Sequence, residues 1–95
     1  MKQNDEKYEE SAALIGKRRD KLEVIKDILR AADNPLGANK TRLVYGSNLN
    51  FNRLQVFLPF LLEKALIEER DDGSYVTTSK GRDFLRQLTD MQKLL

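Results

Sequence analysis

The chain has 95 residues, enough for one domain built around one hydrophobic core. It contains neither histidine nor cysteine, which excludes disulfides, Cys/His zinc sites, thiol nucleophiles and imidazole bases. We therefore predict a protein that is not an enzyme and that uses no cofactor or metal. Lys and Arg number 17 against 15 Asp and Glu, a net charge of only +2.

This small net charge is unevenly distributed. Residues 1–33 are neutral overall, and residues 74–95 carry four bases and two acids. Residues 34–62 carry three bases and no acid, whereas residues 63–73 carry five acids and two bases. A surface that faces phosphate is expected to lack carboxylates. The acid-free segment thus favours a nucleic-acid contact, although a buried segment would also hold few charges.

Neither a membrane span nor a targeting segment is expected. No apolar run approaches the 18 or more residues of a membrane helix. The polar start, residues 1–7, is not followed by the apolar stretch of a signal peptide. We therefore expect a cytoplasmic protein, associated with the nucleoid if it binds DNA.

The first third of the chain predicts one firm helix. Residues 1–16 have few apolar positions and suggest a frayed or extended helix. Residues 17–32 carry a broad apolar stripe and predict a helix, which the loop around Pro35 ends. The stripe comprises Leu22, Ile25, Ile28, Leu29 and Ala32.

A pair of helices is expected next. Residues 40–47 predict a short helix, and residues 46–49 predict a tight turn containing Gly46. Asn50 is a strong N-cap for a third helix, with Leu49 and Leu54 placed for a hydrophobic staple. Pro59 lies within this helix and should kink or divide it. The predicted inner face comprises Phe51, Leu54, Phe57, Leu58, Leu61, Leu62 and Ala65.

The last third predicts a hairpin and a final helix. Residues 66–70 and 75–77 are strand candidates, joined by turn residues 71–74 in which Gly73 can adopt positive φ. Thr78 can cap a helix over residues 79–95. The spacing of Phe84, Leu88, Met91 and Leu95 is that of a coiled-coil seam.

This order predicts a mainly α (α+β) winged helix: a three-helix helix-turn-helix core, a two-stranded β-hairpin wing and a C-terminal dimerisation helix. We divide the chain into an extension (1–16), a winged helix-turn-helix domain (17–78) and a dimerisation helix (79–95).

The residues that define this arrangement also resemble a known family. Residues 41–51 resemble the helix-turn-helix signature of the small archaeal winged-helix DNA-binding proteins, of the ten-kilodalton Sulfolobus type. Residues 21–25, 61–67 and 75–81 resemble the family's first helix, its passage into the wing and its junction with the last helix. The resemblance spans roughly residues 18 to 90.

The resemblance implies a homodimer, formed by an antiparallel coiled coil of the last helices. It also implies binding to double-stranded DNA, with low or unknown sequence specificity, in a transcription-regulating or chromatin role. Three features depart from the family: a short last helix, Pro59 in the third helix, which is the expected recognition helix (about residues 50–62), and the acidic wing tip at Asp71 and Asp72.

Candidate DNA contacts follow from side-chain chemistry. Asn52, Arg53 and Gln55 lie in the first turns of the third helix and suit base edges in the major groove. Further candidates suit the phosphate backbone, although Thr41 could instead cap the second helix. These are Lys40, Thr41, Arg42 and Asn50, with Arg70 and Ser74 on the wing.

Two apolar residues on the third helix leave an alternative open. Val56 and Phe60 fall on its predicted outer arc, where they could contact thymine methyl groups or a protein. The alternative function is therefore a winged-helix protein–protein interaction module that does not bind DNA. The seam on the last helix likewise has two readings, since Phe84 and Leu88 could pack on the core of one copy.

Overall fold

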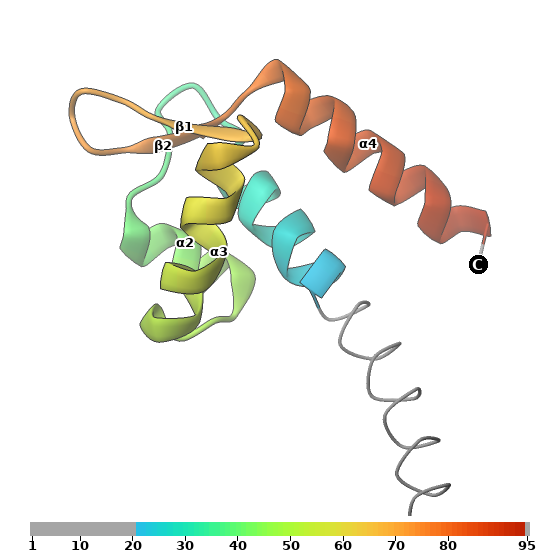
Figure 1. Cartoon of the computed structure of the whole chain (residues 1–95), viewed down its shortest axis with the longest axis horizontal. Helices are drawn as coiled ribbons and strands as arrows, with labels where there is room; N and C mark the ends of the chain where they lie inside the picture. The colour runs from blue at the N-terminus through green and yellow to red at the C-terminus, as the bar shows by residue number, and fades with distance from the viewer. Residues whose placement is uncertain (1–20, 95) are drawn as a thin grey trace, which may run out of the picture.

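The computed structural model describes residues 21–94, which form a helical core with a hairpin on one side (Figure 1). The expected extension over residues 1–16 and the last seam residue, Leu95, lie outside the described residues. Residues 21–32 are helical, and five labelled elements follow: α2 (Lys40–Ser47), α3 (Phe51–Glu63), β1 (Ile67–Glu69), β2 (Tyr75–Thr77) and α4 (Ser79–Leu94). This order confirms the predicted winged helix. Within residues 21–94, no helix has the length and apolar character needed to cross a bilayer.

The core lies between helix 21–32, α2, α3 and the hairpin. Helix 21–32 supplies Ile28, Leu29 and Ala32, which are fully buried. Leu22, predicted in the same stripe, is exposed, and Val24 is buried instead. The remaining centre of the core comes from the other elements: Leu43, Leu54, Leu58, Leu61 and Ile67.

Helix α2 packs closely on helix 21–32 through a glycine. A Cβ atom at Gly46 would lie 2.8 Å from the Cβ of Ala31. The helix predicted over residues 40–47 is confirmed, and the chain reverses at Asn48, whose φ is 54°, within the predicted turn 46–49. The expected place of Gly46 in that turn is wrong, because Gly46 lies inside α2. The glycine serves the helix–helix contact, and asparagine tolerates the left-handed conformation that ends the helix.

Helix α3 begins at the predicted cap and buries one face. The side chain of Asn50 accepts a hydrogen bond from the Arg53 backbone N–H at 2.8 Å, and Leu49 packs on the core beside it. Two predicted inner residues, Phe51 and Ala65, are exposed, because Phe51 is the first residue of α3 and Ala65 follows its C-cap at a φ of 58°. Helix α3 also runs undivided through Pro59.

The hairpin is shorter than predicted on one side. Strand β1 spans Ile67–Glu69 rather than residues 66–70, and it pairs antiparallel with β2, with Glu68 opposite Val76. Gly73 takes the predicted positive φ, 84°. One further pairing was not predicted: Ala38, ahead of α2, exchanges two backbone hydrogen bonds with Tyr75 at 2.8 and 2.7 Å. This bridge ties the wing to the start of the helix-turn-helix.

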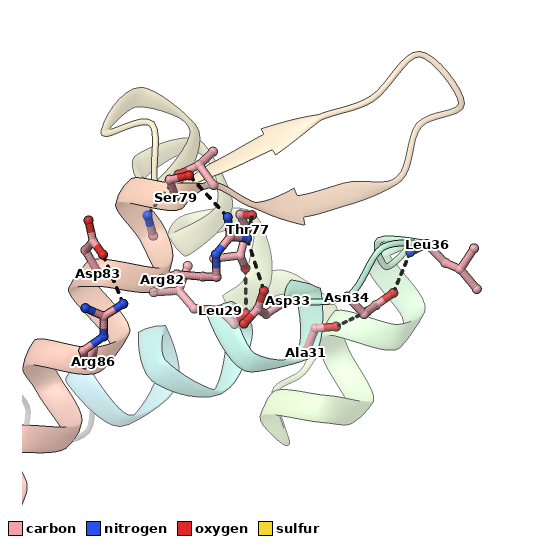
Figure 2. A network of polar contacts seen from close by, with 12 residues as sticks. Leu29, Ala31, Asp33, Asn34, Leu36, Thr77, Ser79, Arg82, Asp83 and Arg86 are labelled. Carbon is pink, nitrogen blue, oxygen red and sulfur yellow. Dashed lines mark hydrogen bonds and ion pairs between the residues drawn. The ribbon is translucent and has the colours of Figure 1, made fainter.

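Helix α4 begins in a tight junction beneath the wing. The Thr78 hydroxyl oxygen caps it by accepting from the Gly81 N–H at 3.0 Å, and the same hydroxyl donates to the Ala65 carbonyl at 2.6 Å. Arg82 forms an ion pair with Asp33 at 3.5 Å, next to the buried hydrogen bond from Thr77 to the Leu29 carbonyl (Figure 2). Near the other end of α4, Gln92 accepts a hydrogen bond from Lys26. Helix α4 therefore runs antiparallel beside helix 21–32.

We predict that Gly81→Ala lowers the free energy of unfolding by about 2–3 kcal/mol, in the upper part of the range for overpacking. The added Cβ would lie 2.0 Å from the Leu66 carbonyl oxygen, a backbone atom that can move only with the wing. Urea denaturation followed by circular dichroism measures the change. Gln87→Ala, at an exposed position of the same helix, serves as control. Equal stabilities of the two variants would contradict the close contact.

Candidate nucleic-acid interface

The outward face of α2 begins the candidate interface. Leu43 and Ser47 are buried, and the Ser47 hydroxyl donates to the Leu43 carbonyl, which leaves that polar group satisfied. The opposite side presents Thr41, Arg42 and Tyr45 to solvent. Arg42 and Tyr45 lie three residues apart and therefore adjoin on the helix surface.

The outward face of α3 continues the interface across the turn. Leu54, Phe57, Leu58 and Leu61 point into the core, so the predicted base-reading residues Asn52, Arg53 and Gln55 are all exposed. Val56 and Phe60 are exposed as predicted, the former by 70%. Together we call the outward side chains the α2–α3 surface: Lys40, Thr41, Arg42, Tyr45, Phe51, Asn52, Arg53 and Gln55.

Cations on this surface sit over aromatic rings. The Lys40 ammonium lies 5.9 Å from the centroid of the Phe51 ring, and the Arg53 guanidinium lies 5.8 Å from that of Phe57. Both separations are within the range of cation–π attraction. The rings thus place the positive charges at the helix-turn-helix, in a stretch of sequence with no carboxylate between Asp33 and Glu63.

The N-cap residues of both helices, Asn39 and Asn50, are exposed. Asn39 accepts from the Arg42 N–H at 2.8 Å and caps α2, so Thr41, the predicted alternative cap, is exposed and does not serve that role. Asn50 caps α3 in the same way. Neither helix has an acidic residue in its first turn, where Asp and Glu are ordinarily favoured. Neutral caps leave the positive ends of both helix dipoles available to an anion.

The wing differs in charge and in how its candidate residues are used. Arg70 donates a hydrogen bond to the Pro35 carbonyl at 2.6 Å, which holds the wing against the loop that precedes α2. Ser74 donates to the Asp72 carboxylate through its hydroxyl at 2.6 Å and through its backbone N–H at 2.9 Å. These two bonds, the hydroxyl first, hold the pKa of Asp72 below its ordinary value. Arg70 and Ser74 therefore serve the wing turn, which stays negative.

The predicted seam on α4 divides into two parts. Phe84 is partly buried against the core, and Leu88, between the Arg82 and Gln92 contacts, is only 7% exposed within one chain. Met91 is 57% exposed. Leu94, which the seam pattern omitted, is 86% exposed at the end of the described chain. The far part of α4 is thus the part with unburied apolar side chains.

Sequence reasoning missed two members of the α2–α3 surface. Phe51 is predicted on the inner face of the third helix and Tyr45 is not among the predicted contacts, yet their side chains are 48% and 81% exposed. The exposure of Phe51 could have been predicted, because Phe51 directly follows the N-cap and so precedes the turns of the helix that pack on the core. Among residues 21–94, no group of three or more Asp or Glu side chains is arranged to hold a metal ion.

Comparison with known proteins places this geometry in a family. The family model for winged helix-turn-helix proteins matches residues 18–95, and the chain belongs to that family.

Two particular relatives sharpen the comparison. The chain is similar to the crystal structure of Sso10a-2, a DNA-binding protein from Sulfolobus solfataricus, with 26% identity and a TM-score of 0.63 over 77% of this chain and 78% of that one. It is also 29% identical over 86 residues to an uncharacterized protein of Methanocaldococcus jannaschii. That match covers 90% of this chain but spans only 40% of the relative's length. The predicted likeness to small archaeal winged-helix proteins is confirmed.

We predict that Ser74→Ala raises the pKa of Asp72 toward its ordinary value, because the stronger of the two hydrogen bonds to the carboxylate is lost. A carboxyl-carbon NMR titration of the full chain measures the shift. Ser79→Ala is the control, since Ser79 accepts from Arg82 on α4 and does not contact Asp72. An unchanged Asp72 titration in Ser74→Ala would contradict the proposed cause.

Proposed function

We propose that the chain binds double-stranded DNA through the α2–α3 surface, with α3 as the recognition helix in the major groove, in transcription regulation or nucleoid organisation. The observation that carries this proposal is the charge of the surface. It gathers Lys40, Arg42 and Arg53 around two neutral-capped helix ends, within a segment that lacks any carboxylate. The family and the DNA-binding relative from Sulfolobus support it.

The polar and charged side chains of the surface have separate roles in this proposal. Asn52, Arg53 and Gln55 offer the donors and acceptors that read base edges. Lys40, Thr41 and Arg42, with the N–H groups that follow Asn50, hold phosphates and set the docking angle. Arg70 and Ser74 were also candidates for phosphate contact. Their hydrogen bonds inside the wing and the adjacent carboxylates favour a wing that points away from the duplex.

We also propose that two copies associate through the far part of α4. Met91 and Leu94 are exposed there, and burying them against a second copy would stabilise a small domain. Phe84 and Leu88 contribute less than the seam pattern predicted, because one chain already buries or half-buries them. A dimer would carry two recognition helices and contact sites about 34 Å apart, or a multiple of that.

A second candidate function has one observation in its favour. Val56 and Phe60 are exposed apolar side chains on α3, and the Lys64 ammonium lies 5.9 Å from the Phe60 ring centroid. A protein-binding module would use this patch. It would show no affinity for any duplex.

We predict that Arg53→Ala weakens binding to duplex DNA by about fivefold or more, since a lost base or phosphate contact typically costs 1–3 kcal/mol. Arg70→Ala should change affinity less, because Arg70 is engaged with the Pro35 carbonyl. Mobility-shift titration at ~50 mM salt measures both. With about 4–8 phosphate contacts per dimer, log affinity should fall against log salt with a slope near −0.9 per contact.

The matched control for this titration is Phe60→Ser, which lies on the same helix outside the α2–α3 surface and should retain DNA affinity. Equal losses in Arg53→Ala and Arg70→Ala would refute the assignment of α3 as recognition helix. Absence of binding by the wild type to every duplex tested would remove the DNA-binding proposal and leave the protein-binding module.

We predict that Met91→Asp converts the proposed dimer to a monomer at micromolar concentration, because a charge would be buried in the contact. Analytical ultracentrifugation measures the mass. Met91 is a better site than Leu88 for this test, since its side chain is exposed in one copy and its replacement leaves the core intact. Lys93→Ala is the control. A wild-type monomer would refute dimerisation through α4.

A further inference from the structure

In duplex binding the base and phosphate contacts fall to the polar and charged side chains of the α2–α3 surface, and its aromatic rings have no assigned role. Tyr45 is 81% exposed on a well-formed helix, and Phe51 is half-exposed across the turn. The two rings flank the turn at Asn48, one from the last part of α2 and one from the first position of α3. We propose that they form a stacking platform for unpaired bases, so that the same surface binds single-stranded DNA. The inference rests on the proposed role of this surface in holding phosphates.

Each ring has a cation placed for the phosphate of a stacked nucleotide. Lys40 lies 5.9 Å from the Phe51 ring centroid, and Arg42 adjoins Tyr45 on the exposed side of α2. Proteins that bind single strands combine these two features: aromatic side chains on which bases stack, and a positive surface that follows the backbone. Stacking does not depend on base identity, because every base has a π face.

The acidic residues beyond α3 favour a single strand that stays on the turn between α2 and α3. Helix α3 has 13 residues and is about 20 Å long. Its last residue, Glu63, is the first acidic residue after Asp33. Beyond that end the wing presents Glu68, Glu69, Asp71 and Asp72, all exposed. A flexible single strand can remain on the turn between α2 and α3 and keep its phosphates away from these carboxylates.

The experiment uses an indole in place of the exposed tyrosine. The sequence contains no tryptophan, so Tyr45→Trp gives the full chain one fluorescent reporter on the platform. We expect its emission to be quenched by a thymidine homopolymer of about 15 nucleotides, a length that spans a typical single-strand site. A duplex of the same length should quench it little, because paired bases are already stacked on each other.

Affinity measurements on the unlabelled chain complete the test. Tyr45→Ala should weaken binding to fluorescein-labelled oligothymidine by about 5- to 150-fold, which corresponds to the 1–3 kcal/mol measured for the loss of one base–aromatic stack, and should weaken binding to a duplex by a clearly smaller factor. Tyr45→Phe keeps the ring and should restore single-strand binding. Leu36→Ala is the matched control, because Leu36 is as exposed as Tyr45 but lies in the loop before α2.

The outcomes separate this inference from the proposed function. Duplex binding without oligothymidine binding, or equal losses for both probes in Tyr45→Ala, overturns the platform and leaves the duplex role in place. Binding to oligothymidine alone supports the platform and overturns the duplex role. Binding to neither overturns both. Tighter binding to a uridine homopolymer than to oligothymidine would overturn the assignment to DNA in favour of RNA.

Discussion

The close approach of α2 to helix 21–32 is the constraint on which the rest of the structure depends. At Gly46 the two helices leave no room for even one methyl group beside Ala31. That contact fixes the tilt of α2, and the short turn at Asn48 then fixes the direction of α3. Every exposed side chain of the α2–α3 surface takes its orientation from this arrangement. Gly46, which in the sequence suggests a turn, is therefore required by the packing of α2 on helix 21–32.

Positive and negative charges lie on different elements of the fold, which share one hydrophobic core. The core takes apolar side chains from every described element. Among the helices of residues 21–94, only α2 contains no acidic residue, and α3 contains none before its last residue, Glu63. On the wing, the Ser74 hydroxyl and backbone N–H donate to the Asp72 carboxylate, which lowers the pKa of Asp72 and keeps it ionised to lower pH than a free carboxyl. These hydrogen bonds favour the charged form of Asp72, so the wing stays negative and repels a polyanion.

Local patterns in the sequence predicted the fold well, because the signals that define its elements are local. The caps at Asn50 and Thr78 and the positive φ at Gly73 each follow from one or two neighbouring residues. What the sequence could not establish depends on contacts distant in sequence. The bridge between Ala38 and Tyr75 was not predicted, and the burial of Leu88 within one copy was one of two alternatives left open; both depend on segments that meet only after folding. Side-chain chemistry identified most of the α2–α3 surface, but it could not establish that Arg70 is committed to Pro35.

Helix α4 is fastened to helix 21–32 at two levels, by Arg82 on Asp33 near its start and by Gln92 on Lys26 near its end. Two attachments about 15 Å apart along one helix prevent it from pivoting. Helix α4 therefore holds a fixed orientation relative to the rest of the domain. If two such helices join, the separation and relative rotation of the paired recognition helices become fixed lengths and angles of the assembly. The rigid geometry of the dimer would then set the spacing between its two binding sites on DNA.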